Sequence, residues 1–105
     1  MFKGSNAPKK VMRGRLKASV NYMWLYFQPI RQYNVKYYRV TLFAGIENPR
    51  PKEIVHLRSS PSTLQIAFKK PFISGQTYSV QILPMFFYSR GEITTFTATL
   101  SKIFC

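Results

Sequence analysis

The chain has 105 residues, with 16 lysines and arginines against three acidic residues, which gives a formal net charge of +13 at pH 7. This length suits one domain, and the composition, 46% hydrophobic and 16% aromatic, excludes a disordered chain. The longest apolar runs are strand-sized and the first residues lead into a polar, basic stretch, so we expect no membrane-spanning helix and no secretory signal in this chain.

The first part of the chain predicts a lead followed by a short strand. Residues 1–10 are rich in small and turn-forming residues and show no hydrophobic periodicity. We therefore expect a flexible basic lead before one domain over residues 11–105. Residues 11–17 alternate as a first strand would, with Met12 and Leu16 facing the interior.

The second predicted strand alternates around Trp24 and closes before Pro29. Trp24 is expected to pack into the core, with Tyr26 on the same face. The opposite face is apolar too, although polar residues are expected on it, so it is either covered as well or forms a contact surface. That face carries Met23, Leu25 and Phe27.

Residues 34–44 predict a third strand, which Gly45 ends. Its inward face is expected to carry Tyr38, Val40 and Leu42, and its outward face Tyr37, Arg39, Thr41 and Phe43. Two prolines predict an extended or turning loop over residues 46–52. A short fourth strand is expected over residues 53–57.

The second half of the chain predicts three more strands. Residues 62–68 alternate as a half-buried strand, with Leu64, Ile66 and Phe68 inward. The next strand is expected to bury Tyr78, Val80 and Ile82, and Pro84 should end it or cause a bulge. A connection over residues 85–92 then precedes a last strand that buries Phe96, Ala98 and Leu100.

One segment has a distinctive spacing: Phe72, then Gly75, then Tyr78 at the start of an alternating strand. It resembles the tyrosine corner of fibronectin type III domains, where the phenol oxygen bonds to the backbone a few residues upstream. Trp24 late in the second strand and Tyr38 two residues before a valine are similar to other positions of that family. The resemblance implies a seven-stranded antiparallel β-sandwich, with Tyr78, Trp24 and Gly75 as structural residues. It implies no particular activity, because such sandwiches host many functions.

The inventory of reactive side chains argues against an enzyme. His56 is the only histidine, Cys105 the only cysteine, aspartate is absent and the three glutamates are far apart. Acid–base and nucleophilic mechanisms, and zinc or calcium sites, need several such groups together. We therefore expect no catalytic residue, no metal and no cofactor. Cys105 cannot form an internal disulfide, so it is either a thiol without a role or a cross-link to a second chain.

Binding remains, and the first hypothesis is a protein-interaction or structural module, either part of a larger assembly or self-associating. Aromatic and arginine side chains dominate interface energetics. The candidate contacts are Tyr37, Arg39, Phe43, Phe86, Phe87, Tyr88 and Arg90, together with the apolar face of Met23, Leu25 and Phe27. The alternative for Phe86 and Phe87 is that they plug one end of the sandwich.

The second hypothesis is a polyanion binder, of nucleic acid or a sulfated glycan, because a strongly basic surface favours acidic partners. Residues 1–17 hold six of the basic residues and no acid. The candidate contacts are Lys9, Lys10, Arg13, Arg15 and Lys17, joined by Arg31, Lys36, Arg39, Lys69 and Lys70. Interleaved tyrosines would stack on unpaired bases. The alternative is a solvated basic terminus that keeps the domain soluble.

Overall fold

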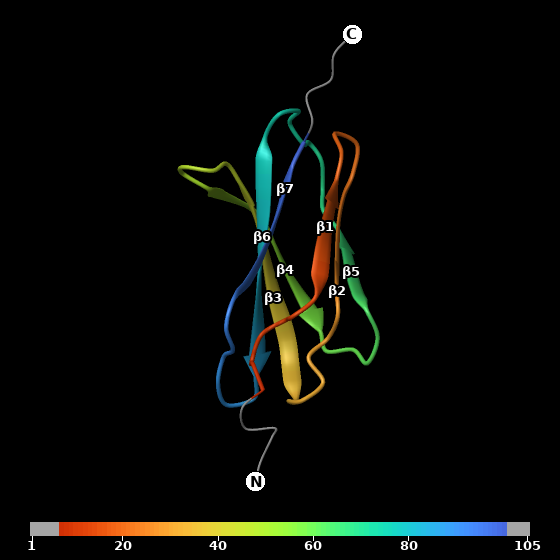
Figure 1. The fold of residues 1–105 in the computed structure, drawn as a ribbon, viewed down its shortest axis with the longest axis vertical. Coiled ribbons are helices and arrows are strands. Elements are labelled where there is room, and N and C mark those ends of the chain that lie inside the picture. The colour runs from red at the N-terminus through yellow and green to blue at the C-terminus, as the bar shows by residue number, and fades with distance from the viewer. Residues whose placement is uncertain (1–6, 101–105) are drawn as a thin grey trace.

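The computed structural model describes residues 7–100, and this part of the chain folds into two antiparallel sheets packed face to face (Figure 1). The first sheet has the order β1-β2-β5, and the second has the order β4-β3-β6-β7. The strands are β1 (Gly14–Ala18), β2 (Met23–Phe27), β3 (Val35–Ala44), β4 (Arg50–Arg58), β5 (Leu64–Ala67), β6 (Thr77–Phe86) and β7 (Thr94–Thr99). The predicted seven-stranded β-sandwich is therefore confirmed. Over the described range, no helix has the length and apolar character needed to cross a membrane.

The core lies between the two sheets and is made by alternate residues of the strands. The predictions for β3, β5 and β6 are confirmed, because their expected inward residues are buried. The buried side chains from these strands are Tyr38, Val40, Leu42, Leu64, Ile66, Tyr78, Val80 and Ile82. Aromatic rings join the layers: Phe27 of β2 meets Tyr38 of β3 edge to face, with ring centroids 5.1 Å apart. Burial of side chains of this size contributes about 1.5–3 kcal/mol each.

Strand β2 has the opposite orientation to the predicted one. Met23, Leu25 and Phe27 are almost fully buried, whereas Trp24 and Tyr26 lie partly exposed on the outer face. The prediction that Trp24 packs into the core is therefore wrong. Of the two alternatives for the opposite face, the first holds, because Met23, Leu25 and Phe27 are covered and form no contact surface. Both faces of this strand are apolar, so its pattern alone does not select the inner one.

The first strand also differs from its prediction. Met12 is 62% exposed, so its expected inward position is wrong, and Val11 is buried instead. Val11 and Leu16, which both pack against the core, are an odd number of residues apart. The alternation therefore breaks before β1 begins at Gly14. The Thr94 hydroxyl donates to the Val11 carbonyl at 2.6 Å, and this hydrogen bond attaches the residues before β1 to the start of β7.

Two prolines lie inside strands where we expected a loop and an interruption. Pro51 is in β4, an edge strand, opposite Phe43 and next to a register shift in β3. An edge strand tolerates a missing N–H because one side of it has no partner. Pro84 lies inside β6, which continues to Phe86, and its carbonyl accepts the Gly91 amide at 2.8 Å. Because β7 pairs with β6 only as far as Ile82, Pro84 breaks no bond with that strand.

The corner before β6 has the hydrogen bond that the family resemblance implies. The Ile73 amide donates to the Tyr78 hydroxyl at 2.8 Å, and the Phe72 ring packs edge to face on the Tyr78 ring. Gly75 has a φ of 83°, which favours glycine, and its amide donates to the Leu100 carbonyl. The corner therefore ties the β5–β6 connection to the end of β7.

Candidate functional site

The end of the sandwich at the bottom of Figure 1 carries the most exposed aromatic residues of the predicted contact set. The Phe86 amide donates to the Ser89 carbonyl at 2.8 Å, which leaves Phe87 and Tyr88 as the two residues at the tip of the β6–β7 hairpin. Phe87 is 60% exposed, and Tyr88 is fully exposed. Two neighbouring aromatic side chains therefore stand in water at the tip of one turn.

The chemistry of the turn does not account for these two aromatics. Tight hairpin turns favour glycine, asparagine or aspartate, because the backbone at the tip commonly needs positive φ. Across residues 7–100 only glycines have positive φ, so the tip is built without that conformation. Phe87 and Tyr88 are therefore not residues that this turn favours, and neither side chain belongs to the hydrophobic core cluster.

A groove of about 270 Å³ lies beside the tip. Its wall is aromatic: the rings of Tyr33 and Phe86 meet edge to face with centroids 5.7 Å apart. The Lys9 ammonium lies 5.4 Å from the centroid of the Tyr33 ring, and the Tyr33 hydroxyl donates to the Ala7 carbonyl. Lys9 itself is held in place, because its carbonyl accepts the Glu92 amide. Residues 7–10 of the predicted lead thus contact the sandwich, and residues 1–6 lie outside the described range.

The structure gathers part of the predicted protein-contact set at this end. Arg90 forms an isolated antiparallel β-bridge with Met85, and Met85 is the partner in register of Tyr37 on β3. These three residues therefore form a row across the strands next to the tip. Phe43 lies six residues further along β3, about 20 Å away at the usual rise per residue. We name Phe86, Phe87, Tyr88, Arg90, Tyr33 and Lys9 the aromatic end.

Phe86 and Phe87 differ, although they are neighbours in sequence. Phe86 is half-buried and packs against the core cluster, whereas Phe87 does not belong to that cluster. The alternative of an end plug therefore fits Phe86 and not Phe87. Tyr33 belongs to the aromatic end but was missed by the sequence analysis, because only the course of the β2–β3 connection brings it to Phe86.

The predicted polyanion set is divided among at least three places. Lys9 is at the aromatic end, whereas Arg13, Arg15 and Lys17 are exposed in alternation along and just before β1, on the outer face of the three-stranded sheet. Lys36 and Arg39 lie on β3, in the other sheet. The ten candidate residues therefore do not form one surface.

The outer face of the three-stranded sheet joins the β1 cations to two aromatic rings. Arg15 is directly opposite Tyr26, and Lys17 is directly opposite Trp24. The Trp24 and Tyr26 rings are nearly parallel, at 19°, with centroids 6.2 Å apart. We name Arg13, Arg15, Lys17, Trp24 and Tyr26 the basic-aromatic face. The sequence analysis missed the aromatic half of it, because it placed Trp24 and Tyr26 on the inward face of the strand.

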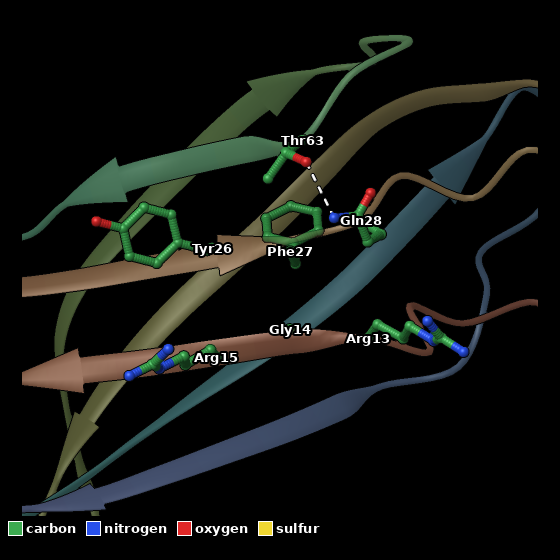
Figure 2. Close-up of a pocket in the computed structure, with 7 residues that line it drawn as sticks. All are labelled: Arg13, Gly14, Arg15, Tyr26, Phe27, Gln28 and Thr63. Atoms are coloured by element: carbon green, nitrogen blue, oxygen red, sulfur yellow. Dashed lines mark hydrogen bonds between the residues drawn. The ribbon is translucent and has the colours of Figure 1, made fainter.

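A groove of about 260 Å³ opens at one end of the basic-aromatic face (Figure 2). Arg15 projects from β1, Arg13 lies just before that strand, and Tyr26 lies on the neighbouring strand β2. At the rim the Gln28 side-chain amide donates to the Thr63 hydroxyl at 3.0 Å. The groove thus combines guanidinium groups, a phenol and neutral hydrogen-bonding groups.

Among residues 7–100 no three potential metal ligands come together. His56 is exposed on β4, and its ring packs edge to face against Tyr37. Cys105 lies outside the described residues.

Comparison with known proteins gives a match at the level of structure only. No protein-family model matches the chain. No curated protein matches it either. Among solved structures, it is similar to the third fibronectin III domain of the human KIAA0343 protein, determined in solution, with a TM-score of 0.65 over 100% of this chain and 92% of that one. The identity is 10%, so the likeness establishes the fold and no function. The chain therefore has the fold of a fibronectin type III domain.

Proposed function

We propose that this protein is a non-enzymatic protein-interaction module whose aromatic end binds an acidic segment of a partner protein. The observation that carries the proposal is the exposure of Phe87 and Tyr88 at the hairpin tip, where neither turn geometry nor core packing requires aromatic residues. Aromatic and arginine side chains supply most of the binding energy in protein interfaces.

The groove beside the tip supports a partner with an apolar anchor. Its wall of Tyr33 and Phe86 would contact an inserted side chain on one side, and Phe87 and Tyr88 would contact it on the other. Removing this apolar surface from water supplies the driving force. Lys9 and Arg90 flank the site and would pair with acidic groups on either side of the anchor.

The charge of the whole chain favours an acidic partner over a second copy. At +13, two copies repel each other, whereas an acidic segment is attracted and its encounter is accelerated. A fibronectin type III fold is compatible with this role, because its loops project from the ends of a rigid sandwich.

Peptides selected from a random display library against the wild-type protein test the proposal. Selected sequences should combine an apolar or aromatic residue with acidic ones. The double variant Phe87→Ser/Tyr88→Ser should bind them about tenfold more weakly by fluorescence polarisation, since loss of two interface aromatics costs about 1.4 kcal/mol or more. Tyr22→Ser is the matched control: Tyr22 is an exposed tyrosine, 42% accessible, in the β1–β2 connection, and its loss should leave affinity unchanged.

Two results would contradict the proposal. One is a selected peptide set whose affinity is the same for the wild type and the double variant. The other is light scattering that finds wild-type dimers at micromolar concentration and monomers of the double variant, because the occupant of the tip would then be a second copy.

A further inference from the structure

We infer that the basic-aromatic face binds single-stranded nucleic acid, with bases stacked on Trp24 and Tyr26 and phosphates bound by Arg13, Arg15 and Lys17. This surface is separate from the aromatic end, and the inference does not depend on the proposed protein partner.

The aromatic half of the face offers two stacking positions in a line. Trp24 and Tyr26 alternate on β2, the central strand of its sheet, so their Cα atoms are about 6.7 Å apart. Their partners in register on β5 are Ala67 and Gln65, which are exposed and are too small or too polar to cover the rings with an apolar contact. Both rings are partly exposed although they are apolar, and aromatic stacking under bases is worth about a fivefold to hundredfold change in affinity per base.

The cationic half runs parallel to the rings. Arg15 and Lys17 stand next to Tyr26 and Trp24 across the β1–β2 ladder, and Arg13 continues the row, again with a spacing of about 6.7 Å. No acidic residue occurs between residues 7 and 30, so nothing in this stretch neutralises the row. Each base on a ring would thus have a cation beside it for its phosphate.

The geometry favours a single strand over other polyanions. A duplex hides the faces of its bases, and the described residues contain no helix that would enter a major groove. A sulfated glycan would use the cations and leave both rings without a base to stack on. At the groove of Figure 2, Gln28 and Thr63 add neutral hydrogen-bonding groups suited to base edges.

The fluorescence of Trp24 provides a direct test, because it is the only tryptophan of the chain. The probes are oligothymidylate and an abasic deoxyribose-phosphate chain of the same length, which carries the same charge without bases. Oligothymidylate should quench Trp24 emission and bind at least about tenfold more tightly than the abasic chain. Equal affinity for the two chains with unchanged emission would show attraction by charge alone and overturn the inference.

Variants separate stacking from charge. Trp24→Ala/Tyr26→Ala should lower affinity for labelled oligothymidylate at least about tenfold, whereas Trp24→Phe/Tyr26→Phe should restore most of it because the rings remain. Thermal melts of each variant would check folding. If the alanine variant binds as the wild type does, the rings take no part and the inference fails.

A charge-matched pair of variants tests the cation row. Each phosphate contact on a single strand contributes about 0.7 to the slope of log affinity against log salt. The variant Arg13→Gln/Arg15→Gln/Lys17→Gln removes three such contacts, so it should reduce the magnitude of this slope by about 2. The control, Lys36→Gln/Arg50→Gln/Arg58→Gln, removes the same charge from exposed positions of the other sheet and should leave most of the slope. Equal losses in both variants would assign the binding to net charge and contradict the inference.

Discussion

Two tyrosine hydroxyls attach loops to the core, and each does so by accepting one backbone amide proton. Tyr78 accepts from Ile73 at 2.8 Å, and Tyr38 accepts from Ile30 at 2.9 Å. Both rings are buried, so each bond satisfies a hydroxyl inside the sandwich. The first bond could be anticipated from the sequence because its partners are five residues apart in a local motif. The second could not, because the course of the β2–β3 connection sets its partner.

Tyr78→Phe should lower the free energy of unfolding by about 1 kcal/mol or somewhat more, because the part-buried Ile73 amide loses its acceptor. Urea denaturation followed by circular dichroism measures the change. Tyr22→Phe removes the same atom from an exposed ring and serves as the control. Equal stability of the Tyr78 variant and the wild type would mean that the hydroxyl does not secure the corner.

Tyr38 should make stability depend on pH in the alkaline range. Desolvation raises the pKa of the buried Tyr38 hydroxyl above its ordinary value of about 10, and the bond from Ile30 opposes this only in part. Above that value the unfolded chain loses a proton that the folded chain retains, so stability is present at lower pH and is lost as pH rises.

The wild type should therefore be more stable than Tyr38→Phe at neutral pH, and the difference should shrink as pH rises above about 10. Urea denaturation of both proteins over this range checks it. A difference that stays constant with pH would contradict the assigned ionisation.

At the scale of elements, the inward face of a strand was predictable where polar residues mark the outward face. Such residues are Arg39 and Thr41 in β3, Gln65 in β5, and Ser79 and Gln81 in β6, and in these strands the predicted faces are the observed faces. In β2 both faces are apolar, and only pairing with β1 and β5 decides which of them enters the core. The candidate site on this sheet could not be predicted for the same reason, because its aromatic half depends on that choice.

The β6–β7 hairpin and the entry to β1 are packed so closely that Gly91 has no room for a side chain. A Cβ there would run into the Lys9 carbonyl and would lie 2.7 Å from Pro84 Cγ. Gly91→Ala should therefore displace residues 7–10 or the hairpin and lower the free energy of unfolding by about 1–3 kcal/mol. Ser89→Ala, at an exposed position of the same hairpin, is the control. Thermal or urea denaturation of both variants decides, and equal stability would mean that this contact relaxes without cost.

At the scale of the whole molecule, the two candidate surfaces are separate, and each carries part of the excess positive charge. The aromatic end lies at the β2–β3 and β6–β7 connections, whereas the basic-aromatic face covers the outside of the three-stranded sheet. Composition alone indicated binding to an acidic partner. Composition could not predict on which surface each cation lies. Lys9 and Arg13 are close in sequence, yet Lys9 contacts Tyr33 and Arg13 borders the outer face of the three-stranded sheet.

The proline in edge strand β4 has a consequence for how copies of this protein meet. The unpaired backbone N–H and C=O groups of an edge strand can pair with a strand of another chain. Proline and charged residues, lysine above all, are common protections against such pairing. Strand β4 has both, with Pro51 between Arg50 and Lys52 and a further cation at Arg58. Pairing of a second copy with this edge, and growth of the sheet into fibrils by that route, are therefore opposed.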